Sequence, residues 1–86
     1  MPTISIFYGI IIQMFWNEHA PPHFHARYGD FEGIINIQEL KMTEGTLPIR
    51  ALALTLDWAE LHQSELLEDW RLCTHKQMPK KIEPLK

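Results

Sequence analysis

The sequence has a single cysteine and no long apolar run. Cys73 has no second cysteine with which to form an internal disulfide, so a disulfide-stapled secreted scaffold is excluded and a reducing compartment is expected. The run Ile10-Ile11-Ile12 is far shorter than the ~20 residues that a helix needs to cross a bilayer. Because the first residues also lack the basic segment of a secretory signal, we expect a cytoplasmic protein without membrane contact.

Excess positive charge and the common nucleotide-binding motifs are absent as well. The formal net charge is −3, which argues against bulk electrostatic binding to nucleic acid. The sequence contains no glycine-rich phosphate loop, no G-x-S-x-G elbow and no zinc-finger spacing. Lysines gather only towards the end, at Lys76, Lys80, Lys81 and Lys86. A basic tail of this kind is usually solvated, and sometimes serves as a docking peptide.

The length and the apolar pattern predict one small α+β domain over residues 1–86. We expect a β-rich half over residues 1–47, a helical arm over residues 48–78 and an extended basic tail over residues 79–86. The β-rich half should form a small twisted antiparallel sheet of three to five strands. The helical arm, as one long helix or two consecutive helices, should pack on one face of this sheet.

The strands are predicted from runs rich in β-branched and aromatic residues, which are separated by glycine turns. The clearest is a hairpin in which Gly29-Asp30 forms a two-residue turn. That turn fixes the register, because aromatic residues then face aromatic residues and Arg27 lies opposite Glu32 as an ion pair. The predicted partners are Tyr28 with Phe31, Arg27 with Glu32, His25 with Ile34, Phe24 with Ile35, and His23 with Asn36.

The second half has the alanine and leucine content of helices. Its first part is apolar nearly all round, which predicts a helix buried against the sheet. If the arm consists of two helices, the break is expected near His62 to Ser64, with Ser64 as the cap of the second helix. Before the helices, Lys41-Met42-Thr43 is expected to form a short return strand.

Three of the five histidines lie within seven residues, around Pro21-Pro22. In an extended segment, alternation points His23 and His25 to the same side. His19, from the adjoining loop, could complete a three-histidine site for a divalent transition metal with an open position. Either Glu18 or Glu32 could add an oxygen ligand.

Two alternatives to a metal site stay open. His23 and His25 could act as a metal-free acid and base, with Arg27 binding a phosphate, which is the minimal set of groups for cutting RNA. Against this, the chain is acidic and Arg27 faces Glu32 in the predicted hairpin. The plainer alternative is that these histidines only shape the loop around Pro21-Pro22.

Several motifs resemble one family of small bacterial proteins, which is classed only as a domain of unknown function, DUF4160. The most specific is Pro-Pro-His-Phe-His-Ala at residues 21–26, preceded by His19. Further matching segments are Met1-Pro2-Thr3-Ile4-Ser5, Phe7-Tyr8-Gly9, Leu47-Pro48, Trp58-Ala59-Glu60-Leu61-His62, Glu65-Leu66-Leu67 with Trp70, and Lys81-Ile82-Glu83-Pro84-Leu85.

The resemblance implies the toxin of a type II toxin–antitoxin pair, neutralised by a small antitoxin-like protein encoded nearby. The implied site residues are His19, His23 and His25. Two positions depart from the family pattern. Ala20 stands where Asn or Asp is common, and Ile49 where a basic residue is common, which weakens a nucleic-acid role.

Three functions are therefore carried forward. The first is the toxin, acting through the histidine motif. The second is a metal-dependent hydrolase or nuclease, and the third is a non-enzymatic protein-binding module that captures a partner through its tail or an exposed sheet edge. Each is compatible with a homo-oligomer.

Overall fold

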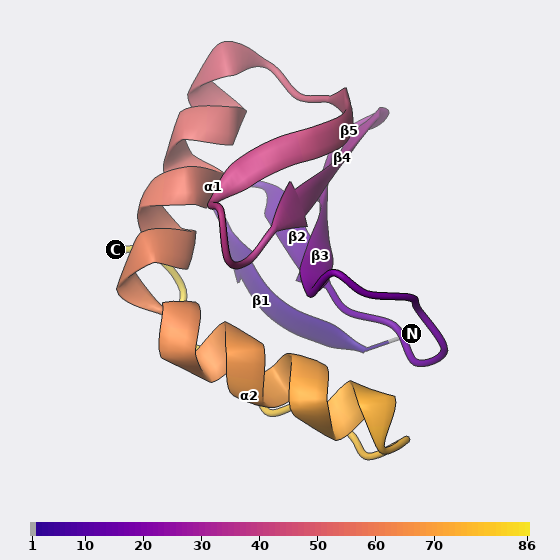
Figure 1. Cartoon of the computed structure of the whole chain (residues 1–86). Helices are drawn as coiled ribbons and strands as arrows, with labels where there is room; N and C mark the ends of the chain where they lie inside the picture. The colour runs from indigo at the N-terminus through magenta and orange to yellow at the C-terminus, as the bar shows by residue number, and fades with distance from the viewer. Residues whose placement is uncertain (1) are drawn as a thin grey trace.

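The chain forms a five-stranded antiparallel sheet followed by two helices, in a computed structural model that describes residues 2–86 (Figure 1). Strand order in the sheet follows chain order, so each strand pairs with the next. The α+β fold with a C-terminal helical arm is confirmed. The elements are β1 (Thr3–Phe7), β2 (Ile10–Gln13), β3 (His23–Tyr28), β4 (Phe31–Asn36), β5 (Lys41–Thr46), α1 (Ile49–Leu61) and α2 (Gln63–Thr74).

Short turns connect four of the strands and fix their register. Tyr8 and Gly9 both adopt positive φ (50° and 79°), which suits the two-residue hairpin turn between β1 and β2. Gly29 (φ 59°) opens the turn between β3 and β4. All five predicted β3–β4 partners are confirmed, from Tyr28 with Phe31 to His23 with Asn36. Register therefore decides which side chains share a face of the sheet.

The two faces of the sheet have different roles. Phe24 and Ala26 of β3 point inwards and are fully buried, whereas His23 and His25 point to the opposite, outer face. The inner face packs against the helices, where the Trp58 ring lies 5.2 Å from Phe7 and 5.8 Å, edge-on, from Phe24. The hydrophobic core therefore lies between the sheet and both helices, with Leu66 and Cys73 of α2 and Ile82 of the tail in it, and the histidines stand outside it.

Helix α1 packs against the sheet, but it is buried along one stripe only, although its sequence is apolar nearly all round. Its buried residues are Ala51, Thr55, Trp58 and Ala59. Ile49 is 89 % exposed and Leu61 is 70 % exposed. The physical reason is that the sheet covers a single side of this helix, so apolar residues on its far side have nothing to pack against.

The helical arm consists of two helices, which turn relative to one another at His62 (Figure 1). His62 has non-helical dihedrals (φ −121°, ψ 25°), and its Nδ1 lies 2.6 Å from a Glu65 carboxylate oxygen. Of the two alternatives, one long helix or two consecutive helices, the structure has two. Ser64, however, lies inside the first turn of α2 and does not cap it, so that part of the prediction was wrong.

The tail, residues 79–86, runs back along α2 and reaches the edge of β1 (Figure 1). Its backbone is held at three points: Lys80 N donates to Asp69 Oδ1 (2.8 Å), Ile82 N donates to Ile4 O (2.8 Å), and Glu83 O accepts from Trp58 Nε1 (2.7 Å). The tail contains no helix or strand, and its Ile82 is buried. Among residues 2–86, no helix has the length and apolar character needed to cross a membrane.

Asp69 anchors this tail, but burial of its carboxylate is energetically unfavourable. Its side chain is buried, and Oδ2 has no hydrogen-bond partner among the described residues. Burial raises the pKa of Asp69, although the hydrogen bond from Lys80 N acts in the opposite direction. The folded chain therefore binds this proton at a higher pH than the unfolded chain does. As a result, the contribution of Asp69 to the free energy of unfolding falls as pH rises through the folded pKa.

We expect Asp69→Asn to raise the free energy of unfolding at pH 7 by on the order of 1 kcal/mol, because it removes a buried charge and keeps an oxygen for Lys80 N. Urea unfolding at pH 7 and pH 5 measures this, and the gap between variant and wild type should shrink at pH 5. Asp57→Asn, on the exposed side of α1, is the control. A variant less stable than wild type at pH 7 would show that the ionised carboxylate is needed to hold the tail.

Candidate metal centre

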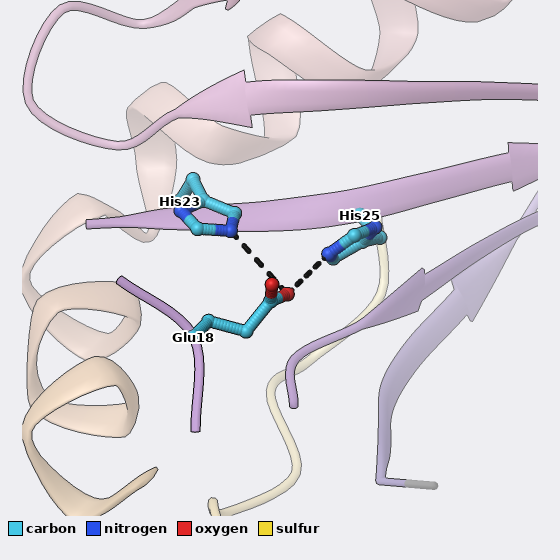
Figure 2. Close-up of side chains that lie close together, drawn as sticks. All are labelled: Glu18, His23 and His25. Atoms are coloured by element: carbon cyan, nitrogen blue, oxygen red, sulfur yellow. Dashed lines mark hydrogen bonds and ion pairs between the residues drawn. The ribbon is translucent and has the colours of Figure 1, made fainter. Parts of the chain in front are cut away.

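Glu18, His23 and His25 converge at the beginning of β3 (Figure 2). Glu18 arrives from the loop between β2 and β3, while alternation along β3 places both histidines on the outer face. Glu18 Oε1 lies 2.5 Å from His25 Nε2 and 3.3 Å from His23 Nε2. One ligand atom from each of the three residues lies within 4.8 Å of the others, which is a spacing that a single metal ion can bridge.

The second nitrogen of each histidine is already occupied. His23 Nδ1 donates to the carbonyl of Pro21 (2.9 Å), and His25 Nδ1 donates to Glu32 Oε2 (3.0 Å). Such outer hydrogen bonds fix the tautomer and the ring orientation of metal-binding histidines. Both Nε2 atoms are thus turned towards Glu18, with their outer partners provided by the Pro21 carbonyl and by β4.

Charge in this cluster is concentrated around His25. Its two nitrogens both face carboxylates, Nε2 that of Glu18 and Nδ1 that of Glu32. Burial pushes the pKa of Glu18 upwards. The hydrogen bond and positive charge of His25, helped by His23, outweigh burial and hold the pKa of Glu18 below its ordinary value. Glu18 is therefore ready to bind a cation near neutral pH.

Aromatic rings enclose the two histidines from the sides. Trp70 of α2 lies 5.0 Å from the His23 ring, and Phe15 meets the His25 ring edge-on at 4.7 Å. The side chains of both histidines are only 13 % exposed, against 29 % for Glu18. Gln13, the cross-strand partner of His25, is buried, and its Oε1 has no hydrogen-bond partner among the described residues. Oxygen and nitrogen donors are thus held where water has limited access.

A pocket of about 250 Å³ opens beside the cluster and includes Glu18 and His23 in its wall. Its other lining residues come from the loop before β3, from β4 and from β5. They are His19, Ala20, Pro21, Ile34, Asn36, Thr43 and Glu44. A ligand in this pocket would contact the Glu18 side of the cluster.

The structure brings together some of the residues predicted from the sequence and separates others. His23 and His25 lie side by side as expected, but Glu18 completes the group, while His19 lines the neighbouring pocket. Arg27 is exposed, and it makes no ion pair among residues 2–86. The predicted Arg27–Glu32 ion pair was wrong, because the Glu32 carboxylate binds His25 instead.

A scan against protein-family models matches the domain of unknown function DUF4160 over residues 9–71. The chain belongs to the DUF4160 family. The matched range includes Glu18, His23, His25 and Glu32, so the whole cluster lies within the DUF4160 domain. Searches of curated proteins and of solved structures found no match to this DUF4160 chain.

The ligand set of this DUF4160 domain suits particular metals. Two histidines with one carboxylate are the protein ligands of several catalytic zinc sites, which keep a further position for water or substrate. The same set on one face also binds iron(II) and related transition metals. Within residues 2–86, no other group of three His, Cys, Asp or Glu side chains is close enough to share an ion.

Proposed function

We propose that this DUF4160 protein is a metal-dependent hydrolase and that its activity makes it the toxin of a type II toxin–antitoxin pair. The observation that supports a metal centre is the convergence of Glu18, His23 and His25, with both histidines already oriented by outer hydrogen bonds. A structural cluster would not need an adjacent pocket, whereas a hydrolytic centre needs one for its substrate. The toxin role rests on the sequence resemblance.

Each residue has a distinct part in this proposal. A bound divalent metal would act as a Lewis acid and would lower the pKa of water. Glu18, His23 and His25 would hold the ion, and Glu32 would keep the His25 ring in place through Nδ1. Phe15 and Trp70 would limit the access of bulk water to the histidines. A small antitoxin-like partner would neutralise the protein by direct binding.

The proposal is tested by inducing the wild type and variants in bacteria while measuring growth and, on purified protein, metal content. We expect the wild type to inhibit growth and to hold about one zinc or similar ion per chain when purified without chelator. Glu18→Gln and the double variant His23→Ala/His25→Ala should lose both properties, because each removes at least one ligand. His75→Ala, which changes an exposed histidine at the end of α2, should keep both.

The two parts of the proposal fail separately. If the wild type contains no metal and gains none on dialysis against zinc, nickel or manganese, the metal centre is disproved. If the wild type binds metal but does not slow growth, the toxin role is disproved. Growth inhibition that persists in the metal-free variants would place the toxic activity outside this cluster.

A further inference from the structure

Gln13 is a buried polar residue on the same face of the sheet as the metal centre. It ends β2 and lies directly opposite His25 of β3, and Ile12, one residue earlier, lies opposite Ala26. Directly opposite residues of an antiparallel pair send their side chains to the same face, with Cβ atoms about 4.5–5.5 Å apart. Ile12 and Ala26 are buried in the core, so Gln13 points with His25 to the outer face. The amide of Gln13 is therefore within reach of the metal centre.

The amide oxygen of Gln13 lacks a hydrogen-bond partner. Gln13 is only 7 % exposed, and its Oε1 is buried without a donor among residues 2–86. Burying an oxygen without a hydrogen bond costs free energy, and folded proteins rarely leave one unpaired. Amide oxygens of glutamine, like carboxylate oxygens, also bind divalent cations. A cation in the neighbouring centre would therefore supply the partner that Oε1 lacks.

Two other buried side-chain oxygens are unpaired among residues 2–86, and neither is placed to serve the centre. Ser5 Oγ belongs to β1, where Ser5 lies opposite the core residue Ile12 and so on the inner face. Asp69 belongs to α2, and its second oxygen already accepts a hydrogen bond from Lys80 N. Of these three residues, only Gln13 has a cross-strand partner that belongs to the metal centre.

We propose that the amide oxygen of Gln13 is a fourth protein ligand of the metal ion, beside Glu18, His23 and His25. This inference rests on the metal centre of the proposed function and completes its ligand set with two imidazole nitrogens, one carboxylate oxygen and one amide oxygen. Because Gln13 is neutral, the site of a divalent ion keeps an excess of positive charge, which a Lewis acid needs. Zinc in catalytic sites expands to five ligands and manganese(II) takes six, so a position stays open for water.

Gln13→Leu tests the ligand, because it removes the amide oxygen without adding another donor atom. Zinc affinity is measured by competition with a chelator, and stability is measured by urea unfolding in EDTA. We expect Gln13→Leu to bind zinc at least about ten-fold more weakly than the wild type, since even outer partners contribute 10–100-fold. In EDTA, Gln13→Leu should be more stable than the wild type, because it no longer buries an unpaired oxygen. A purely structural role for Gln13 would not produce these two opposite changes.

Gln13→Glu tests the same position in the opposite direction. Its carboxylate replaces the amide oxygen as a ligand, so zinc should bind at least as tightly as in the wild type. In EDTA, the buried carboxylate near Glu18 should lower stability. Zinc affinity should therefore decrease from Gln13→Glu to the wild type to Gln13→Leu, and stability in EDTA should increase in the same order. Ser5→Ala is the matched control, because it removes a buried unpaired oxygen from the inner face and should leave zinc affinity unchanged.

Cobalt(II) in place of zinc reports on the ligands directly, because its visible absorption spectrum depends on their number and type. The spectrum of Gln13→Leu should differ from that of the wild type, and the spectrum of Ser5→Ala should superimpose on it. A wild type that binds neither zinc nor cobalt would refute the metal centre itself. If the wild type binds zinc and Gln13→Leu binds it equally well, or keeps the cobalt spectrum, the centre stands and Gln13 is not a ligand.

Discussion

Trp58→Ala should lower the free energy of unfolding by about 3–5 kcal/mol, which is the usual cost of removing a fully buried tryptophan. Trp58 is 0 % exposed and packs against Phe7 of β1 and Phe24 of β3, so its removal leaves a cavity where the sheet meets α1. Domains of this size have total stabilities near the lower end of about 5–15 kcal/mol. We therefore expect a large fraction of Trp58→Ala molecules to be unfolded at 37 °C. Urea titrations at this temperature, extrapolated to water, measure that fraction.

Two further variants separate packing from tail anchoring. Leu61→Ala removes an exposed side chain of the same helix and should change stability by less than about 0.5 kcal/mol. Trp58→Phe keeps most of the apolar contact but loses the hydrogen bond to Glu83 O. Trp58→Phe should lower the free energy of unfolding by about 1–2 kcal/mol. It should also speed amide hydrogen exchange at Ile82, whose N–H donates to Ile4 O of β1. Equal losses for Trp58→Ala and Leu61→Ala would contradict this account of the core.

The β3–β4 hairpin could be predicted residue by residue, and its physics explains why. A two-residue turn leaves a single register for the strands, and slipping by one residue would turn Phe24 and Ala26 to the outer face. The sequence therefore contains enough local information to place His23 and His25 on the same side. The choice between one helix and two stayed open, because Ser64 was the only cap that the sequence offered and His62 holds that position instead.

The partner of Glu32 was predicted wrongly because only directly opposite residues were compared. Glu32 lies opposite Arg27, but long side chains in a sheet also reach diagonal neighbours two residues along the partner strand. His25 is that diagonal neighbour, and its Nδ1 accommodates the Glu32 carboxylate at 3.0 Å. Arg27 stays exposed, which removes it from the cluster. A comparison of directly opposite residues alone cannot tell whether Glu32 pairs with Arg27 or with His25.

The remaining parts of the site depend on segments without periodicity. Glu18 was recognised as one of two carboxylates that could join the histidines, but only the path of the loop between β2 and β3 selects it over His19. Glu44 was missed because β5 was expected to end at Thr43. The bulge and Gly45 extend the strand to Thr46 and bring Glu44 opposite Ile34. Glycine at residue 45 was the available signal, since glycine within a strand often marks a bulge.

Zinc should raise the thermal stability of the wild type strongly, because an ion that binds only the folded chain stabilises it by mass action. At a free zinc concentration of 100 times the Kd, the expected gain is about 2.7 kcal/mol, or about 10–20 °C in the melting temperature of a domain this small. EDTA should reverse the shift. Differential scanning calorimetry with and without zinc measures both changes on the same sample.

The loss of the zinc-dependent rise in melting temperature should be largest for variants that remove a ligand and smaller for variants that remove an outer partner. Glu18→Gln and His25→Ala should lose most of the zinc-dependent shift, since each removes a ligand. Glu32→Gln removes only the outer partner of His25, and outer partners typically contribute 10–100-fold in metal affinity. At the same zinc concentration, Glu32→Gln should therefore keep at most about half of the zinc-dependent gain in the free energy of unfolding. His75→Ala should match the wild type. If Glu32→Gln matched the wild type while His25→Ala lost the shift, His25 would bind the ion without help from Glu32.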